Sequence, residues 1–561
     1  MPDEAEATPT LDAADMALVA QLGVRRQVRE GEYLYREGDV TYDFFVMVSA
    51  EVDIVVVVDG SERVVARHGP GRFLGELNML SGLRVFVSAR VVAAGEVVVI
   101  PRDRLRQLMA TNPRLGDTIL AAFVARRGLL MTEAAPSIRV IGSRFSPESL
   151  GIREFLTRTR IPHEWLDADR DPQVDALLGQ LGIAATELPF VVASGTMLRR
   201  ATAGDVASYL GLTIESLPSR CFDLVVVGGG PAGLAAAVYG ASEGLHTLGV
   251  EMAAPGGQAG MSSRIENYLG FPMGISGAEL TQRAIIQAEK FDASLTAPCE
   301  VVSLGSRAGH LVVRLSDGTE IAARAVIAAT GAYYRRLEAS RLSDFEGNGV
   351  YYAATELEAR VCGPSPVVVV GGGNSAGQAA IFLSQGGCPV TLIIRGGDLG
   401  KDMSRYLVER IESDPHVTLR TRATVVAREG DRTLEAVQLH GPDDVDVVLP
   451  CSGLFSFIGA DPSSGWLNGC AALDEKGFVL TDLSLSSEEL GKSWQALDRS
   501  PLPFETSHQC LAPGSPIRSR NRCSSTAPPY DRRNGLSTPW GERPQGQRDE
   551  LRIVGHLRQA T

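Results

Sequence analysis

The chain has 561 residues, of which 44% are hydrophobic and 22% are charged, and its formal net charge is −13. This length exceeds what one hydrophobic core supports, and at roughly 100 to 200 residues per domain we expect about three or four domains. The negative charge argues against nonspecific binding to nucleic acid, because such binding depends on clustered Lys and Arg.

The first residues, 1–16, are acidic and lack the basic and apolar regions of a secretion signal. No apolar run approaches the roughly 18 residues that cross a bilayer. We therefore expect a cytoplasmic protein with neither a membrane nor a nucleic acid as partner. The eight cysteines include no Cys-x-x-Cys pair. This spacing argues against a disulfide scaffold or a zinc ribbon, and we expect no metal site.

Residues 1–135 are predicted to form a small antiparallel β-barrel followed by helices. Apolar and polar residues alternate over 32–100 in short runs separated by glycines, which is typical of strands and turns. Apolar residues then recur with helical spacing over 101–131, with a break at Asn112-Pro113. A barrel followed by helices is the order expected of a switch that responds to a ligand.

Two motifs in this region, residues 31–39 and 73–82, resemble the catabolite-activator type of cyclic-nucleotide-binding domain. In that family a Gly-Glu-Leu turn faces the ribose phosphate, and an Arg pairs with the buried cyclic phosphate. The resemblance implies a cyclic nucleotide site made by Gly75, Glu76, Leu77, Arg84 and Ser88. The match at Arg84 is poorer, because three larger residues stand between it and Ser88. The alternative is a barrel kept for packing or oligomerisation.

Residues 137–214 are predicted to follow the order β-α-β-α-β-β-α, with the second helix over 173–181. This order resembles glutaredoxin and thioredoxin, and Leu188-Pro189 stands where that family has a cis-proline. The first helix opens with Ser146-Pro147 and not with Cys-x-x-Cys, so dithiol exchange is excluded there. We interpret the segment as a docking or spacer domain.

Residues 220–334 begin with a buried strand, 222–227, followed by a glycine-rich turn, a helix and a strand that ends in Glu251. This is the order of a dinucleotide-binding fold. Its glycines let the backbone approach a pyrophosphate at the helix N-terminus, and the carboxylate binds ribose hydroxyls. The predicted contacts are Gly228, Gly230, Pro231, Ala232, Gly233 and Glu251.

Residues 335–465 repeat this pattern, with a strand over 366–370, a helix to Leu383 and a strand over 390–394. The predicted contacts with a second dinucleotide are Gly371, Gly373, Asn374, Ser375, Ala376 and Arg395. The fold class is therefore α/β, with two Rossmann-like domains after the barrel and the thioredoxin-like segment.

Several further stretches resemble thioredoxin reductase, in which a nicotinamide domain is inserted into a flavin domain. They cover residues 255–277, 329–332, 457–459 and a return to the flavin domain over 466–507. The resemblance implies FAD and NADPH as cofactors, with NADH as the alternative, and a homodimer, although the residues leave the oligomeric state open. It adds these flavin contacts: Gly257, Gln258, Asn267, Thr330 and Gly331.

Two departures from that family limit the analogy. Thioredoxin reductases carry Cys-Ala-Thr-Cys at the start of the nicotinamide domain, whereas this chain has Ala353 and Glu356 in place of both thiols. We therefore identify no catalytic residue, and we assign the nearby Cys362 to packing. A pair of arginines usually meets the 2′-phosphate of NADPH, and here Arg395 is followed by two glycines, with Lys401 further on.

We predict an FAD-dependent oxidoreductase in which NAD(P)H gives a hydride to the flavin. The electrons would leave to an external acceptor, such as a disulfide protein, an iron-sulfur protein, a quinone or oxygen. The resemblance of the barrel adds the hypothesis that a cyclic nucleotide regulates this reaction. The alternatives are a catalytically impaired nucleotide-binding sensor and a ferredoxin or quinone type of NADPH reductase.

The end of the chain, residues 508–561, departs from the family abruptly after Ser507. It lacks the Gly-Asp motif that binds the flavin in the family, and it contains nine Arg, no Lys, four acidic residues and six Pro. This composition favours disorder. Our hypothesis is a shift of the reading frame, in which case the flavin domain is incomplete and FAD binds weakly.

Overall fold

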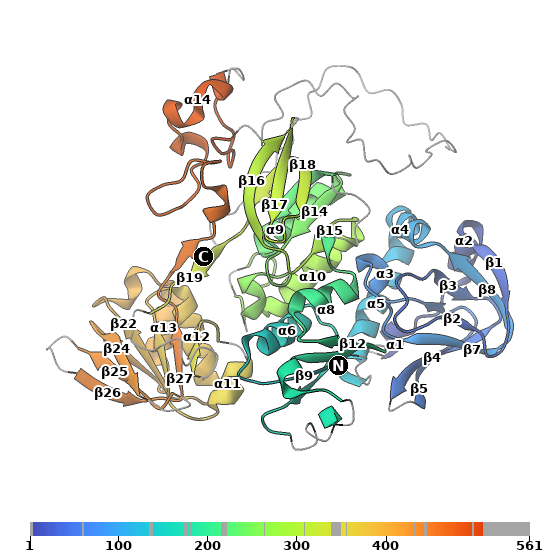
Figure 1. Ribbon diagram of the computed structural model, residues 1–561, viewed down its shortest axis with the longest axis horizontal. Helices are drawn as coiled ribbons and strands as arrows, with labels where there is room; N and C mark the ends of the chain where they lie inside the picture. Colours follow the sequence, from blue (N-terminus) through green and yellow to red (C-terminus); the bar gives the residue numbers. More distant parts are fainter. Residues whose placement is uncertain are drawn as a thin grey trace. The chain divides into compact units, whose positions relative to one another are not determined.

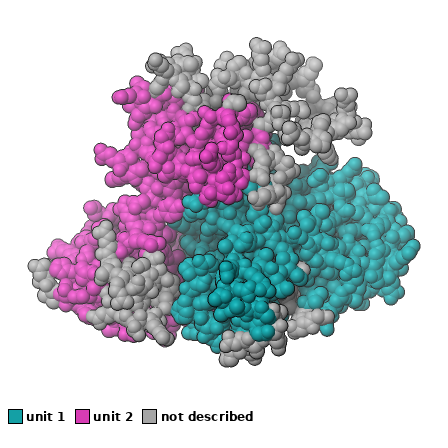
Figure 2. All heavy atoms as spheres, in the orientation of Figure 1, with its two compact units in different colours: residues 1–218, 226–262, 276–300 teal, residues 219–225, 263–275, 301–561 magenta. Residues whose placement is uncertain are grey.

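The structure is a computed structural model, and it describes residues 4–58, 61–133, 138–171, 174, 177–179, 182–193, 195–214, 221–262, 264–266, 268–307, 309–337, 349–354, 356–429, 434–441, 446–495 and 499–508. The chain forms two compact units (Figure 2). Unit 1 comprises Met1–Pro218, Val226–Ser262 and Ser276–Glu300, and unit 2 comprises Ser219–Val225, Ser263–Ile275 and Val301–Thr561. In the part of the chain that is described, no helix is long and apolar enough to cross a membrane.

The N-terminal part of unit 1 is the predicted barrel, built from two antiparallel sheets in the orders β1-β8-β3-β6 and β2-β7-β4-β5 (Figure 1, blue). Its strands are β1 Val24–Val28, β2 Tyr33–Tyr35, β3 Phe44–Met47, β4 Glu51–Val58, β5 Ser61–His68, β6 Phe73–Leu74, β7 Ser88–Ala93 and β8 Gly95–Ile100. One apolar core fills the barrel, and a second joins it to the helices.

The helices of this part are α1 Glu4–Ala7, α2 Ala13–Leu22, α3 Asn78–Ser81, α4 Arg102–Thr111 and α5 Pro113–Glu133. The predicted break at Asn112-Pro113 is confirmed. Proline has no N–H to donate and its fixed φ suits the first position of a helix, so Pro113 begins α5. Phe123 of α5 packs against Phe44 and Phe73 of the barrel, with ring centroids 6.3 and 6.4 Å apart. Helix α5 is thereby tied to the barrel.

The next segment of unit 1 has a four-stranded sheet in the order β10-β9-β11-β12. Its elements are β9 Ile138–Gly142, α6 Pro147–Arg158, β10 His163–Asp167, η1 Ala185–Glu187, β11 Phe190–Ala193, β12 Thr196–Arg199 and α8 Ala203–Leu210. The pair β9/β10 is parallel and the other pairs are antiparallel. The Leu188-Pro189 bond is cis. These elements follow the predicted order, and the helix predicted over 173–181 falls largely outside the described residues.

The flavin-type fold begins with β13 Cys221–Val227, which is shared between the units. In unit 1 the neighbours of β13 in the sheet are β14 Thr247–Val250 and then β15 Ser294–Thr296. The helices of this part are α9 Pro231–Ser242, η3 Gln258–Met261 and α10 Gly277–Lys290. In unit 2 the sheet order runs from β13 to β18 Glu320–Ala328, β17 His310–Leu315 and β16 Val301–Arg307. The first strand and helix lie where the glycine pattern predicts them.

The second dinucleotide fold lies wholly in unit 2 and is a five-stranded parallel sheet in the order β20-β27-β21-β22-β23. Its elements are β20 Val350–Tyr351, α11 Glu356–Cys362, β21 Val367–Val370, α12 Asn374–Gln385, β22 Val390–Ile394, η5 Leu399–Lys401, α13 Arg405–Ser413, β23 Val417–Thr421 and β27 Gly453–Ser456. A separate antiparallel sheet comprises β24 Thr424–Glu429, β25 Ala436–His440 and β26 Asp446–Pro450.

Two short antiparallel strands lead into and out of this fold, β19 Ala332–Tyr334 and β28 Ala460–Pro462. The elements that follow are η6 Gly465–Leu467, η7 Asp482–Ser484 and α14 Ser487–Gln495. The motif that ends at Ser507 is anchored: the Trp494 indole N–H donates to the Ser507 carbonyl at 2.9 Å, and Arg499 pairs with both carboxylate oxygens of Glu505. The hypothesis for residues 508–561 concerns a segment that, beyond His508, lies outside the described residues.

Candidate dinucleotide sites and nucleotide cassette

The first glycine turn connects β13 to the N-terminus of α9. Gly228 has φ of +106°, a conformation that favours glycine, and its N–H donates to the Val250 carbonyl at 2.8 Å. Pro231 is the first residue of α9 and Gly230 its N-cap. The N–H groups of a helix's first turn have no carbonyl within the helix to bond, so this end of α9 offers donors to an anion.

Glu251 follows β14 and its carboxylate turns back to the glycine turn. One oxygen accepts from the Gly229 N–H at 2.6 Å, and the other accepts from the Ala253 N–H at 3.1 Å. A carboxylate accepts about four hydrogen bonds, so both oxygens retain capacity for ribose hydroxyls. The predicted flavin ribose ligand therefore lies at the edge of the predicted pyrophosphate turn.

The predicted flavin loop also contacts this turn. The Gly256 N–H donates to the Gly229 carbonyl at 2.7 Å, and a Cβ on Gly257 would lie 2.7 Å from the Gly230 Cα. Gly257 also has φ of +54°, so both the backbone conformation and the overlap with Gly230 disfavour a side chain there. Gln258 begins the helix η3 directly after it, whereas Asn267 lies outside the described residues.

Thr330 and Gly331 lie in unit 2, where the chain enters the nicotinamide-type fold. The Thr330 hydroxyl donates to the Ser463 carbonyl at 2.6 Å, and the Ser463 N–H donates to the Gly331 carbonyl at 3.0 Å. Arg335 pairs with Asp461 at 2.7 Å. These contacts join the incoming and outgoing strands β19 and β28, so the predicted flavin residues here belong to a two-stranded connection.

The second glycine turn has the same construction as the first. Gly371 has φ of +147°, and a Cβ on it would lie 2.3 Å from the Phe457 carbonyl oxygen. Gly373 is the N-cap of α12, and the Asn374 side-chain oxygen accepts from the Ser404 N–H at 2.7 Å. Ser375 is exposed in the first turn of α12, whereas Ala376 is buried against the sheet. The turn again presents helix N–H groups to an anion.

Arg395 follows β22 and is exposed, and it forms no hydrogen bond or ion pair with another described residue. The structure adds Arg422, which the sequence analysis missed. Ile394 pairs with Thr421 in the parallel strands β22 and β23, so the residue after each strand lies at the same edge. The Arg422 Nε lies 3.2 Å from the position of a Cβ on Gly397. Two cationic side chains therefore flank the turn after β22.

The two family thiols are absent, and the remaining cysteines nearby are buried. Cys362, Cys388 and Cys451 are at most 4% exposed. Burial raises the pKa of the Cys362 thiol to about 11 and that of Cys451 to about 12. Since the thiolate is the reactive form, these thiols are poor nucleophiles at neutral pH. This agrees with the packing role assigned to Cys362.

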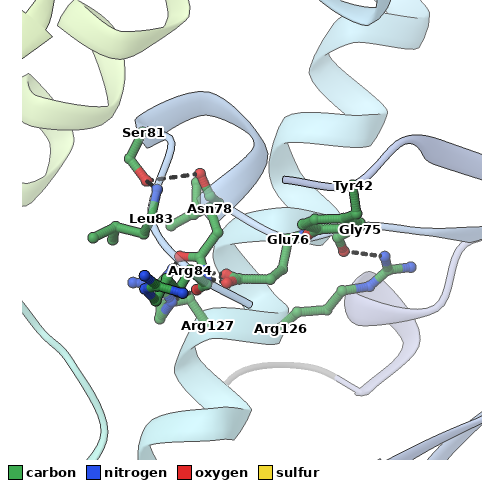
Figure 3. Close-up of polar contacts among 10 residues, drawn as sticks. Tyr42, Gly75, Glu76, Asn78, Ser81, Leu83, Arg84, Arg126 and Arg127 are labelled. Atoms are coloured by element: carbon green, nitrogen blue, oxygen red, sulfur yellow. Dashed lines mark hydrogen bonds and ion pairs between the residues drawn. The ribbon is translucent and has the colours of Figure 1, made fainter. Parts of the chain in front are cut away.

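Three of the predicted cyclic nucleotide residues, Gly75, Glu76 and Arg84, lie in the segment between β6 and β7 (Figure 3). Gly75 has φ of +136°, and a Cβ on it would meet Met79 and Phe123 within 3.0 Å. The Glu76 carboxylate is buried and pairs with the Arg127 guanidinium of α5 through contacts of 2.8 to 3.1 Å. Leu77 and Ser88 are also buried, and the Ser88 hydroxyl accepts from the Glu37 N–H at 2.9 Å.

Arg84 is bound by protein carbonyls. Its Nη1 donates to Gly38 at 2.9 Å, its Nε donates to the Tyr209 carbonyl, and its backbone N–H donates to Leu210 at 3.3 Å. Tyr209 and Leu210 end helix α8, where carbonyls lack partners within the helix and a cation is favourable. The expected ligand groups Glu76 and Arg84 are thus both occupied by protein partners.

The end of helix α10 and the residues that follow it contact the barrel helices through charged groups within unit 1. Arg106 of α4 pairs with Asp292, and Lys290 pairs with Asp117 at 3.5 Å. Burial raises the pKa of Glu289 to about 7, and the opposing influences that lower it come from Arg127, Arg106 and Arg102, while Glu76 raises it further. Glu289 of α10 therefore interacts electrostatically with Arg127 of α5, the residue that pairs with Glu76.

The two glycine turns, each at the carboxyl end of a parallel strand and the start of a helix, define a two-dinucleotide oxidoreductase. Residues 222–490 match the family described as pyridine nucleotide-disulphide oxidoreductase, and residues 25–112 match the cyclic nucleotide-binding domain. The chain belongs to the thioredoxin reductase family of pyridine nucleotide-disulphide oxidoreductases. This family uses FAD and NADPH.

Its relatives include the thioredoxin reductase of Treponema pallidum, 35% identical over 263 residues, which are 46% of this chain and 83% of that protein. The thioredoxin reductase of Streptomyces coelicolor is 33% identical over 262 residues, which are 46% of this chain and 80% of that protein. The crystal structure of T. acidophilum thioredoxin reductase is similar over 51% of this chain and 88% of that chain, with 27% identity and a TM-score of 0.45.

The residues at the two glycine turns, with Glu251, Arg395 and Arg422, fit both cofactors. At Gly257 and Gly371 a Cβ would overlap neighbouring backbone, so the glycine turns keep the close backbone packing that a pyrophosphate site requires. Glu251 retains free acceptor capacity, which suits the ribose of FAD. Among the described residues, Arg395 and Arg422 supply unpaired cations at the turn after β22, which suits the additional phosphate of NADPH.

Proposed function

We propose that this protein oxidises NADPH through bound FAD and delivers the electrons to an external acceptor without an internal dithiol. The observation that carries the proposal is the combination of two intact glycine turns with Ala353 and Glu356 at the thiol positions. When bound, FAD would take up a hydride from NADPH and return two electrons to an acceptor. The acceptor classes are a disulfide protein, an iron-sulfur protein, a quinone or oxygen.

The protein contributes binding and orientation to this reaction. The N-terminus of α9 would hold the FAD pyrophosphate, and Glu251 would hold its ribose. The N-terminus of α12, with Ser375, would hold the pyrophosphate of NADPH, and Arg395 with Arg422 would bind its 2′-phosphate. Binding and orienting each dinucleotide is the contribution of the protein, because no side chain is required as acid or base.

The test compares two acceptors under identical conditions. The wild-type protein is expected to oxidise NADPH with a small quinone or dye and to reduce thioredoxin slowly. The double variant Ala353→Cys with Glu356→Cys restores both thiol positions and serves as the matched comparison. Rapid reduction of thioredoxin by the wild-type protein would refute transfer without a dithiol, and Cys362 with Cys388 or Cys451 would then be the thiols to examine.

We further propose that a cyclic nucleotide regulates the reaction through the barrel. The supporting observation is that Arg84 bonds both the barrel and the end of α8, so a phosphate that draws Arg84 away would release α8. Such a ligand would also displace Arg127 from Glu76, and breaking a buried pair costs about 3 to 5 kcal/mol. We therefore expect weak binding.

Calorimetry with cyclic AMP and cyclic GMP tests this regulation, together with turnover in their presence. Glu76→Gln keeps the volume of the side chain while it removes the charge, and it is expected to abolish the response to either nucleotide. No binding to the wild-type protein would make the barrel structural.

A further inference from the structure

The thioredoxin-like segment lacks thiols, yet it contacts the predicted flavin loop directly. Arg158, the last residue of α6, is 13% exposed at its side chain. Its Nη2 donates to the carbonyls of Ala254 at 2.8 Å and Gly257 at 2.9 Å, and its Nη1 pairs with Glu154 at 3.0 Å. A single guanidinium nitrogen thus bridges the two ends of the turn 254–257.

The turn 254–257 is also held by the buried side chain of Ala254. Ala254 is 1% exposed and belongs to the apolar core of the thioredoxin-like segment, with Phe155 and Leu156 of α6. Burial in that core and the hydrogen bond from Arg158 act on one residue, so Ala254 is fixed at both its side chain and its backbone. The contact is therefore a built interface within unit 1.

The position of this turn matters for the glycine turn beside it. Gly257 has φ of +54°, and its carbonyl is the acceptor of Arg158. A Cβ on Gly257 would lie 2.7 Å from the Gly230 Cα, which is the N-cap of α9. Arg158 holds the carbonyl of the residue that packs on the predicted pyrophosphate site.

We propose that Arg158 is a positioning residue of the flavin site and that the thioredoxin-like segment serves the reductase as a clamp on the turn 254–257. The proposal rests on FAD binding at the first glycine turn, as proposed above. Loss of the two hydrogen bonds leaves two carbonyls unpaired and lets Gly257 leave its conformation, which widens the site and lowers its affinity for FAD.

The experiment uses the full chain with three variants. Arg158→Met retains the length and packing of the side chain but donates no hydrogen bond, and Arg158→Lys retains one compact donor group. Glu154→Gln is the matched control, because it changes the ion pair of Arg158 and leaves the bonds to the turn in place. Hydrogen exchange of residues 254–260 is measured on the protein without FAD, and FAD affinity is measured by quenching of flavin fluorescence.

Arg158→Met is expected to raise the FAD dissociation constant by roughly tenfold to a hundredfold, the loss expected for one or two charged hydrogen bonds. Exchange of the turn is expected to accelerate by about tenfold or more, since its local opening becomes easier. Arg158→Lys is expected to restore part of both effects, and Glu154→Gln to leave both within about twofold of wild type.

Wild-type exchange together with wild-type FAD affinity in Arg158→Met would overturn the proposal. Faster exchange with unchanged affinity would also overturn it, because the turn would then be irrelevant to the flavin. If Arg158→Met fails to fold, Arg158→Lys decides by the same two readouts. A wild-type protein that binds no FAD would refute the proposed function instead, and exchange of the turn would still decide whether Arg158 clamps it.

Discussion

Arg395 and Arg422 are expected to determine the preference for NADPH over NADH. The paired residues Ile394 and Thr421 place the two arginines on neighbouring parallel strands, which lie about 4.8 Å apart. Both guanidinium groups can therefore reach one phosphate. Each charged hydrogen bond contributes about 1.5 to 3 kcal/mol, and exposure of both side chains favours the lower value. Arg395→Ala or Arg422→Ala alone should raise the KM for NADPH roughly tenfold.

The assay measures KM and kcat with both nucleotides and a dye acceptor. The KM for NADH should stay within about twofold, because NADH has no 2′-phosphate to lose. Arg405→Ala is the control, since Arg405 is exposed in the same fold and already pairs with Glu409. Equal losses for both nucleotides would refute the role in phosphate binding, and an effect of Arg395→Ala alone would remove Arg422 from the site.

Three other perturbations have definite outcomes. Gly371→Ala should lower the free energy of unfolding by roughly 3 kcal/mol or more, seen as a lower melting temperature, because its Cβ would overlap the Phe457 carbonyl oxygen; an unchanged melting temperature would contradict the close packing. Cys362→Ala should leave dye turnover unchanged, since the pKa of its thiol is about 11; a large loss of turnover would make Cys362 part of the reaction. Glu289 has its pKa raised from 4.5 to about 7, so the folded state binds this proton more tightly than the unfolded chain does. Its contribution to stability is present below pH 4.5 and is lost as the pH rises through 7. Because Glu289 keeps some solvent access, we expect a loss of roughly 1 to 2 kcal/mol in denaturation midpoints measured across this range, absent in Glu289→Gln; equal pH profiles would contradict it.

The dinucleotide folds could be predicted from the sequence because their signals are local. The strand over 390–394 was predicted with the bounds that the structure has, and the strand of the second glycine turn differs by one residue. A buried strand, a glycine turn and a helix follow one another within about 20 residues, and the first glycine of each turn, Gly228 and Gly371, has a positive φ that favours glycine.

The partners of the predicted site residues could not be found in this way. Arg127 pairs with Glu76 across 51 positions, and Arg158 meets Gly257 across 99 positions. Arg422 lies beside the turn after β22 only because β23 pairs with β22. Such contacts depend on how elements pack, and neither periodicity nor a motif marks them. The parallel order of the strands was the one available signal for Arg422, because residues that follow adjacent parallel strands share an edge.

The cyclic nucleotide site is a second case in which the sequence shows a motif but not the partners of its residues. The Gly-Glu-Leu motif is recognisable in the sequence, and the family match over residues 25–112 supports it. The motif alone does not show that Glu76 is paired with Arg127 or that Arg84 caps α8. The assignment of Gly75, Glu76, Leu77, Arg84 and Ser88 to a ligand therefore stays a prediction.

The central claim is that NADPH reduces a flavin held by this chain, and that the electrons leave without a dithiol. An anaerobic titration of the full-length protein, loaded with FAD, tests it most directly. The flavin absorbance should be bleached completely by one equivalent of NADPH, since Ala353 and Glu356 leave no thiol pair at that position to take up a second. Addition of a quinone should then restore the absorbance. A flavin that NADPH does not bleach would contradict the account and favour a nucleotide-binding sensor without turnover, and a requirement for two equivalents would reveal a second redox centre.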